Sequence, residues 1–95
     1  MAKFYSHTKT MNLRQLICTF VKGDDEPFHE AWDRFKALKS QCPHHYYPRE
    51  LLNQFFYDGL NITTQYMVDG AAGKNIGEYT AEEATNLFEI LGENL

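Results

Sequence analysis

Three residues that are close together in the sequence could bind a metal ion, namely Cys42, His44 and His45. Thiolate and imidazole groups are ligands that zinc prefers, but a tetrahedral site needs four of them, usually as closely spaced pairs. The other candidate ligands are scattered singly: His7, Cys18 and His29. The spacing therefore favours a loop with a buried cysteine and polar histidines, and we expect no metal site. We also expect Cys18 and Cys42 to be reduced, partly buried thiols.

Two patterns that would indicate an enzyme are incomplete. A phosphate-binding loop could end at Lys74, but no serine or threonine follows that lysine, and Val68 stands where the first glycine is required. The dipeptide Asp69-Gly70 is not set in the Asp-Ser/Thr-Gly pattern of retroviral-type aspartic proteases. Most other carboxylates fall at predicted helix starts and on polar faces, where they stabilise the fold. We therefore predict that the chain is not an enzyme and uses no cofactor.

A pair of opposite charges, Glu26 and Arg34, flanks the start of a predicted helix. The two side chains could be a solvated surface pair, which contributes little to stability. Alternatively, Arg34 folds back and makes bidentate, charge-assisted hydrogen bonds to the carboxylate or the backbone of the turn at residues 23–26. The spacing alone is compatible with both interpretations.

The helix that carries Arg34 is predicted to run from Pro27 to Gln41. Acidic residues precede it and favour the positive end of its dipole, Pro27 suits the first turn, and Pro43 follows its end. Large apolar side chains recur at spacings of three and four: Phe28, Ala31, Trp32, Phe35 and Leu38. This stripe must be buried, so the rest of the chain should pack around it.

Four further helices are predicted from caps, prolines, glycines and apolar spacing. They run from Thr8 or Thr10 to about Val21 before Gly23, from Pro48 to about Asp58 before Gly59, from Asn61 or Thr63 to Gly73, and from the capping box at residues 80–83 to Gly92. Residues 74–79 are expected to form a turn. The expected core combines the central helix with later helices through Phe28, Trp32, Phe35, Phe55, Phe56, Leu87 and Phe88.

Composition limits the chain to one folded domain, residues 1–95. The chain is 43% apolar and 15% aromatic, which argues against disorder. No apolar run approaches the roughly 20 residues of a membrane span, and residues 1–10, an N-terminal arm, lack the apolar core of a signal peptide. The default location is therefore the cytoplasm. The net charge of −4 conceals alternating blocks of basic and acidic sequence, which suit either contacts between copies or a soluble surface.

The spacing of Glu26 and Arg34, with Pro27-Phe28 after the glutamate and Phe35 after the arginine, resembles the major homology region of retroviral Gag capsid proteins. Lys22 stands where that motif has a glutamine. Further blocks of sequence occur in the order seen in Gag proteins of plant gypsy-type long-terminal-repeat retrotransposons: residues 13–17, 30–36, 42–45, 55–61, 68–73 and 80–84.

The resemblance implies an all-α fold, a compact bundle of five helices like the C-terminal domain of a retroviral capsid protein. It implies a structural role, in which copies of the domain dimerise and make lattice contacts in a virus-like particle, with the rest of the Gag polyprotein as a further partner. The structural residues of the motif would be Lys22, Glu26, Phe28, Trp32, Arg34 and Phe35. The two-fold contact would lie on the third helix, at Glu50, Leu51, Gln54 and Tyr57.

Other functions are kept as alternatives. A domesticated Gag fragment could bind a partner peptide in a groove between the first two helices, beside Trp32. The dipeptide Tyr46-Tyr47 could form an exposed aromatic contact. The basic residues near the N-terminus could touch RNA, but the chain is net acidic and has no zinc knuckles, so we expect neither nucleic acid nor a membrane as a direct partner.

Overall fold

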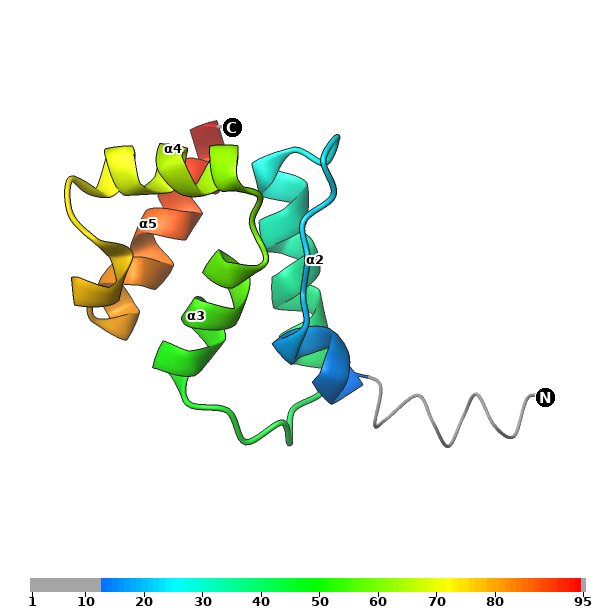
Figure 1. Ribbon diagram of the computed structural model, residues 1–95. Helices are drawn as coiled ribbons and strands as arrows, with labels where there is room; N and C mark the ends of the chain where they lie inside the picture. The colour runs from blue at the N-terminus through cyan, green and yellow to red at the C-terminus, as the bar shows by residue number, and fades with distance from the viewer. Residues whose placement is uncertain (1–12, 95) are drawn as a thin grey trace.

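The computed structural model describes residues 13–94, and every regular element within that range is helical (Figure 1). The named elements are α2 (Phe28–Gln41), α3 (Arg49–Asp58), α4 (Ile62–Ala72), the 3₁₀ helix η1 (Ile76–Glu78) and α5 (Ala81–Asn94). Residues 13–18 are helical as well. The predicted all-α class is confirmed, with five α-helical segments in the described part of the chain.

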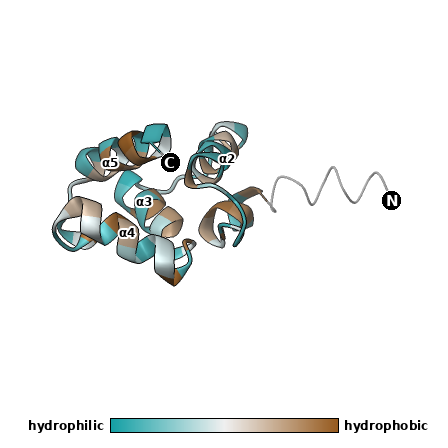
Figure 2. Cartoon of the chain, turned by 90° about the horizontal axis from the view of Figure 1, so that it is seen from above, coloured by the Kyte–Doolittle hydropathy of each residue, from teal (hydrophilic) through white to brown (hydrophobic). Residues whose placement is uncertain are grey.

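The helices pack around α3. In Figure 1, α2 and α3 run in opposite directions side by side, and α4 lies across the end at which α3 finishes. Seen from above, α3 stands between α4 and α5 (Figure 2). Helix α5 packs against both α2 and α3, while α4 contacts η1. Segments from both ends of the described chain therefore meet around one central helix.

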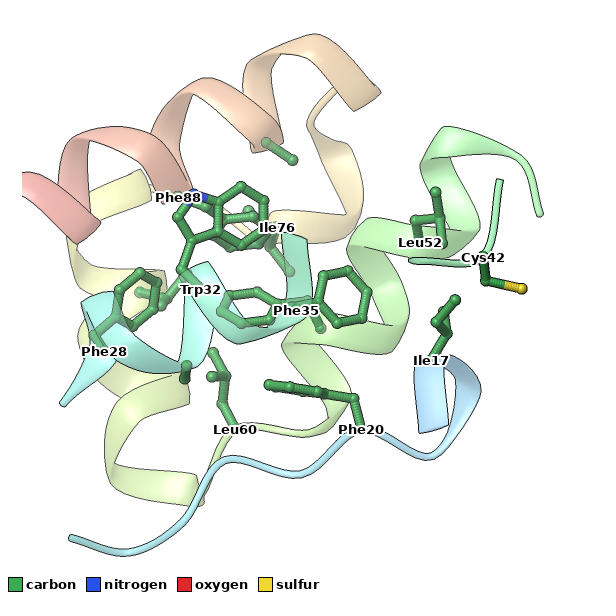
Figure 3. Packing of buried hydrophobic residues seen from close by; sticks show 14 residues of the cluster. Ile17, Phe20, Phe28, Trp32, Phe35, Cys42, Leu52, Leu60, Ile76 and Phe88 are labelled. Carbon is green, nitrogen blue, oxygen red and sulfur yellow. The ribbon is translucent and has the colours of Figure 1, made fainter. Parts of the chain in front are cut away.

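The core is a cluster of aromatic rings from four elements (Figure 3). Trp32 of α2 is only 1% exposed, and its ring lies 4.9 Å from that of Phe56 on α3 and 5.3 Å from that of Phe88 on α5. Phe20, from the segment before α2, meets Phe35 edge-on at 5.0 Å. Such contacts combine area burial with favourable ring geometry. The rings of this cluster therefore hold the elements together.

Two residues expected in the core, Phe55 and Leu87, are only partly buried. Phe55 turns away from the central cluster and packs edge-on against Tyr47, with the ring centroids 5.1 Å apart. The cysteines also differ from each other, since Cys42 is buried and Cys18 is exposed. Both are free thiols as predicted, but the expected partial burial of Cys18 is wrong.

The first helix ends earlier than predicted. Its helical residues stop at Cys18, so the expected end near Val21 and the role of Gly23 as terminator are wrong. The backbone N–H of Lys22 donates instead to the carbonyl of Gly59, at 2.8 Å. Residues 20–22 thus pair with the end of α3, and a continued helix would forfeit that contact. The predicted cap at Thr8 or Thr10 and the arm at residues 1–10 lie outside the described residues.

Most local end signals are confirmed. The Asn61 side chain accepts from the N–H of Thr64 at 3.0 Å and caps α4, and Gly73 ends that helix with a left-handed φ of 73°. The capping box before α5 forms reciprocally, with Thr80 N–H donating to Glu83 at 2.9 Å and Glu83 N–H donating to Thr80 at 3.1 Å. Pro27 and Pro48 sit at the N-caps of α2 and α3.

One glycine assignment and one loop assignment were wrong. Gly59 directly follows α3 as expected, with an ordinary right-handed φ of −80°. Gly92, by contrast, lies inside α5, which continues to Asn94. A Cβ on Gly92 would lie 3.3 Å from the Trp32 ring, so this glycine allows close packing and does not end the helix. Residues 74–79, predicted as a turn, contain η1 with the buried side chain of Ile76.

Candidate interaction surfaces

Arg34 is bound to the turn before α2 by three hydrogen bonds. Its Nε donates to Glu26 Oε2 at 3.0 Å, and its Nη2 donates to Glu26 Oε1 at 2.9 Å and to the carbonyl of Val21 at 2.8 Å. Glu26 Oε1 also accepts from the N–H of Gly23 at 3.0 Å. Of the two interpretations of this pair, the bidentate one is confirmed. The fork joins α2 to the chain that precedes it.

The electrostatics agree with this geometry. The hydrogen bond from Arg34 holds the pKa of the Glu26 carboxyl below its ordinary value of 4.5, although burial acts in the opposite direction. The same hydrogen bond raises the pKa of the Arg34 guanidinium. The guanidinium carbon also lies 4.3 Å from the centroid of the Phe20 ring, a cation–π distance. Each group therefore favours the charged form of its partner.

Lys22 lies in the same turn and is buried. Its Nζ donates to the carbonyl of Gly23 at 3.0 Å, and its backbone N–H donates to Gly59. Phe28, Trp32 and Phe35 are buried too, and so are not accessible to a partner. The expected groove beside Trp32 is thus contradicted, because that side chain lies in the core. These residues support the fold and do not form a binding surface.

The residues predicted for a two-fold contact lie on the outer side of α3, but they differ in how far their side chains are exposed to a partner. Glu50, Leu51 and Gln54 are exposed, and Leu51 keeps 39% of its surface. Gln54 donates to Asp58, one turn later, at 2.7 Å. Tyr57 is half-buried, and its hydroxyl is already engaged by α4. Three of the four predicted residues are therefore free to meet a partner.

A shallow hollow of about 150 Å³ adjoins this surface. Its lining comes from three elements: Glu50, Asn53, Gln54 and Tyr57 of α3, Ile76, Gly77, Tyr79 and Thr80 in and around η1, and Ala81 and Ala84 of α5. Asn53 is the buried polar member of this lining, and its Nδ2 donates to the carbonyl of Ala81 at 2.9 Å. The volume is below the roughly 300 Å³ at which small-molecule pockets begin. Sequence patterns had not indicated this hollow, because its lining converges only in the tertiary fold.

Tyr57 should titrate at unusually high pH. Burial and the hydrogen bonds from its hydroxyl to both oxygens of Asp69, at 2.8 and 3.0 Å, raise its pKa from 10.0 to about 12. The folded state holds this proton more tightly than the unfolded state. The stabilising contribution is therefore complete below pH 10.0 and is lost as the pH rises to about 12. Absorbance titration of tyrosinate should show a late step, which Tyr57→Phe removes.

The matched control for this titration is Tyr66→Phe, which changes an exposed ring on α4. That variant should keep the late step. A late step that persists in Tyr57→Phe would contradict the assignment.

The two adjacent tyrosines in the loop between α2 and α3 differ in their surroundings. Tyr46 is exposed and adopts a positive φ of 64°, which is uncommon for a residue with a side chain. Tyr47 instead packs back, stacked on His45 with ring centroids 5.6 Å apart and edge-on to Phe55. An exposed aromatic contact could therefore involve Tyr46 and not Tyr47.

Residues 13–94 contain neither a candidate metal centre nor a helix that could span a membrane. No group of three or more histidine, cysteine, aspartate or glutamate side chains there could hold a metal ion. None of the described helices combines the length and apolar character needed to cross a membrane.

Comparisons of the chain with known protein families, with curated protein sequences and with solved structures found no match.

Proposed function

We propose that this chain is a structural domain that self-associates, similar to the capsid part of Gag from a plant gypsy-type long-terminal-repeat retrotransposon. It would dimerise and make lattice contacts in virus-like particles assembled in the cytoplasm, with the rest of the Gag polyprotein as its other partner. It would act without catalysis or a cofactor.

The observation that carries this proposal is the fork between Arg34 and Glu26. The motif to which the sequence is similar has a glutamate and an arginine at this spacing, preceded by a glutamine in whose place this chain has Lys22. Here the two side chains meet through two hydrogen bonds, and the same arginine also binds the carbonyl of Val21. If the two side chains were solvated and made no hydrogen bond to each other, the similarity to the motif would have no structural support. The all-helical arrangement is compatible with the proposal but is shared by many other functions.

The proposed two-fold contact uses the outer side of α3. A two-fold axis brings the same patch of both copies together, so one exposed apolar residue contributes buried surface from each copy. Leu51 supplies that residue, on the same exposed side of α3 as the polar side chains of Glu50 and Gln54. The patch is small, and each contact should be weak. Weak contacts suit assembly, because many copies together supply the avidity.

Sedimentation velocity over a wide concentration range tests this proposal. Wild type should dimerise reversibly, and Leu51→Asp should raise the dissociation constant at least about tenfold, because it places two carboxylates at a two-fold contact. The matched control is Val21→Asp, which puts the same charge on another exposed aliphatic residue, 66% exposed, in the segment before α2. Val21→Asp should leave association unchanged.

Two outcomes would contradict parts of the proposal. Dimerisation that survives Leu51→Asp would place the contact elsewhere and remove α3 from it. A chain that is monomeric at every concentration would contradict self-association.

A further inference from the structure

The loop between α2 and α3 forms one end of the molecule, and this end is rich in positive charge (Figure 1). Residues 35–49, which include the loop, contain three basic side chains and no aspartate or glutamate. The helical residues 13–18 add a fourth, since the guanidinium carbon of Arg14 lies 5.0 Å from the centroid of the Tyr47 ring. We call this region the basic end, and its basic side chains are Arg14, Lys36, Lys39 and Arg49.

Three of these four cations have no acidic partner. Lys36 Nζ lies 3.0 Å from Glu89 Oε1. In the part of the chain that the structure describes, no ion pair involves the other three, Arg14, Lys39 and Arg49. Burial, followed by the nearby charges of Lys36 and Arg49, lowers the pKa of Lys39 below its ordinary value of 10.5. Like charges are therefore held close together, and an added anion would relieve their repulsion.

The same loop presents an aromatic ring to solvent. Tyr46 is 81% exposed, has a positive φ of 64°, and lies with its ring centroid 6.0 Å from that of His44. The loop around it is held in place, because His45 N–H donates to the carbonyl of Cys42 at 3.2 Å and Tyr47 N–H donates to His45 Nδ1 at 2.9 Å. An uncommon backbone conformation that projects a ring into water points to a contact made outside the chain.

Unpaired cations beside an exposed ring match the chemistry of a single strand of nucleic acid. Its phosphates supply negative charge, and its unpaired bases supply flat surfaces on which an aromatic ring stacks. An acidic peptide would neutralise the cations but would offer no base to the ring of Tyr46. A duplex would leave that ring without a partner too, because its bases already stack on one another.

We propose that the basic end binds a single strand of nucleic acid, with its unpaired cations against the phosphates and Tyr46 stacked on a base. The net charge of −4 suggested the opposite expectation. Net charge is an average over the whole chain, however, whereas screening by salt limits a bound phosphate to charges within about 8 Å. This inference goes beyond the proposed function, because it needs only one copy of the chain.

Fluorescence anisotropy with a labelled oligothymidine of about 12 nucleotides tests this inference, since single-strand sites commonly span about 4 to 16 nucleotides. Wild type should bind at low salt. The logarithm of its association constant should fall with the logarithm of the salt concentration with a slope of about −2, as three phosphate contacts require.

Tyr46→Asn should weaken this binding about tenfold, because it removes the stacked ring. Asparagine tolerates the left-handed backbone conformation, so the loop should keep its shape. The matched control is Tyr66→Ala, which removes another exposed ring, from α4 at the opposite end of α3. That variant should bind as wild type does.

A second pair of variants tests the cations. Arg49→Gln should reduce the magnitude of the salt slope by about 0.7, the value of one phosphate contact with a single strand. Lys74→Gln neutralises an exposed lysine between α4 and η1 and should leave the slope unchanged. Thermal unfolding of each variant checks that the fold is kept.

Four results would overturn the inference. The first is no binding of oligothymidine by wild type at low salt. The second is equal binding by wild type and Tyr46→Asn, which would mean that no base stacks on the ring. The third is a duplex of the same length that binds at least as tightly, as its higher charge density alone would cause. The fourth is polyglutamate that binds as tightly as oligothymidine, which would indicate an acidic protein as the partner.

Discussion

Gly59→Ala is expected to lower the free energy of unfolding by about 3 kcal/mol or more, the upper range for overpacking a tight site. A Cβ on Gly59 would overlap the carbonyl oxygen of Phe20 and lie 2.8 Å from its carbonyl carbon. Both groups are backbone, so a change of rotamer cannot relieve the clash. Separating the two segments would also break the hydrogen bond from Lys22 N–H to the carbonyl of Gly59. Chemical denaturation of the dilute, monomeric protein measures the loss.

Gly70→Ala is the matched control, because it makes the same chemical change within α4, where no heavy atom lies within 4 Å of the new Cβ. Alanine has the higher helix propensity, so this variant should be more stable than wild type by about 0.5 to 1 kcal/mol. Opposite signs for the two substitutions would support the close approach at Gly59. Similar small effects would contradict it.

Arg34→Ala is expected to cost about 2 kcal/mol, whereas Lys36→Ala should cost about 0.5 kcal/mol. Arg34 makes two hydrogen bonds to a largely buried Glu26 and one to the carbonyl of Val21. Its own partial exposure keeps the figure moderate. Lys36 instead makes a single hydrogen bond to Glu89, whose side chain is 45% exposed, so solvent weakens this pair. Equal, small losses would mean that Arg34 is merely solvated.

Two further measurements isolate the geometry of this fork. Arg34→Lys keeps the charge but cannot form the planar, bidentate contact, so it should recover only a minor part of the loss. The lowered pKa of Glu26 adds stability that is present above the ordinary carboxyl pKa of 4.5 and is lost as the pH falls through the lower value of the folded state. In wild type, the free energy of unfolding should therefore decrease as the pH falls through this range. In Arg34→Ala, the part of that decrease that comes from Glu26 should be absent.

Local chemistry was enough to predict much of the fold. Proline at the start of α2 and α3, the side-chain cap at Asn61, the left-handed Gly73 and the capping box at residues 80–83 all act within a few residues of a helix end. The apolar stripe of α2 likewise depends only on the period of a helix. Signals of such short range can be read from a sequence, and the all-α class follows from them.

The candidate surfaces were predicted only in part. The outer side of α3 was indicated because Leu51 lies off the buried stripe of its helix, and Leu51 is indeed exposed. The exposed side of α4, which carries Ile62 and Tyr66, was missed, although one signal was present: residues 61–73 contain a single charged residue, Asp69. Only the hydrogen bond from Tyr57 revealed that this charge is turned away from the exposed face.

The sequence by itself determined the approximate positions of the helices, how most of them are capped and the burial of the rings of Phe28, Trp32, Phe35, Phe56 and Phe88. Only the tertiary structure decided that Arg34 closes on Glu26, that residues 20–22 pair with the end of α3, and that Gly59 and Gly92 serve close packing. The physical reason is range. Helix signals act over three or four residues, whereas each of these decisions depends on a partner at least eight positions away along the chain.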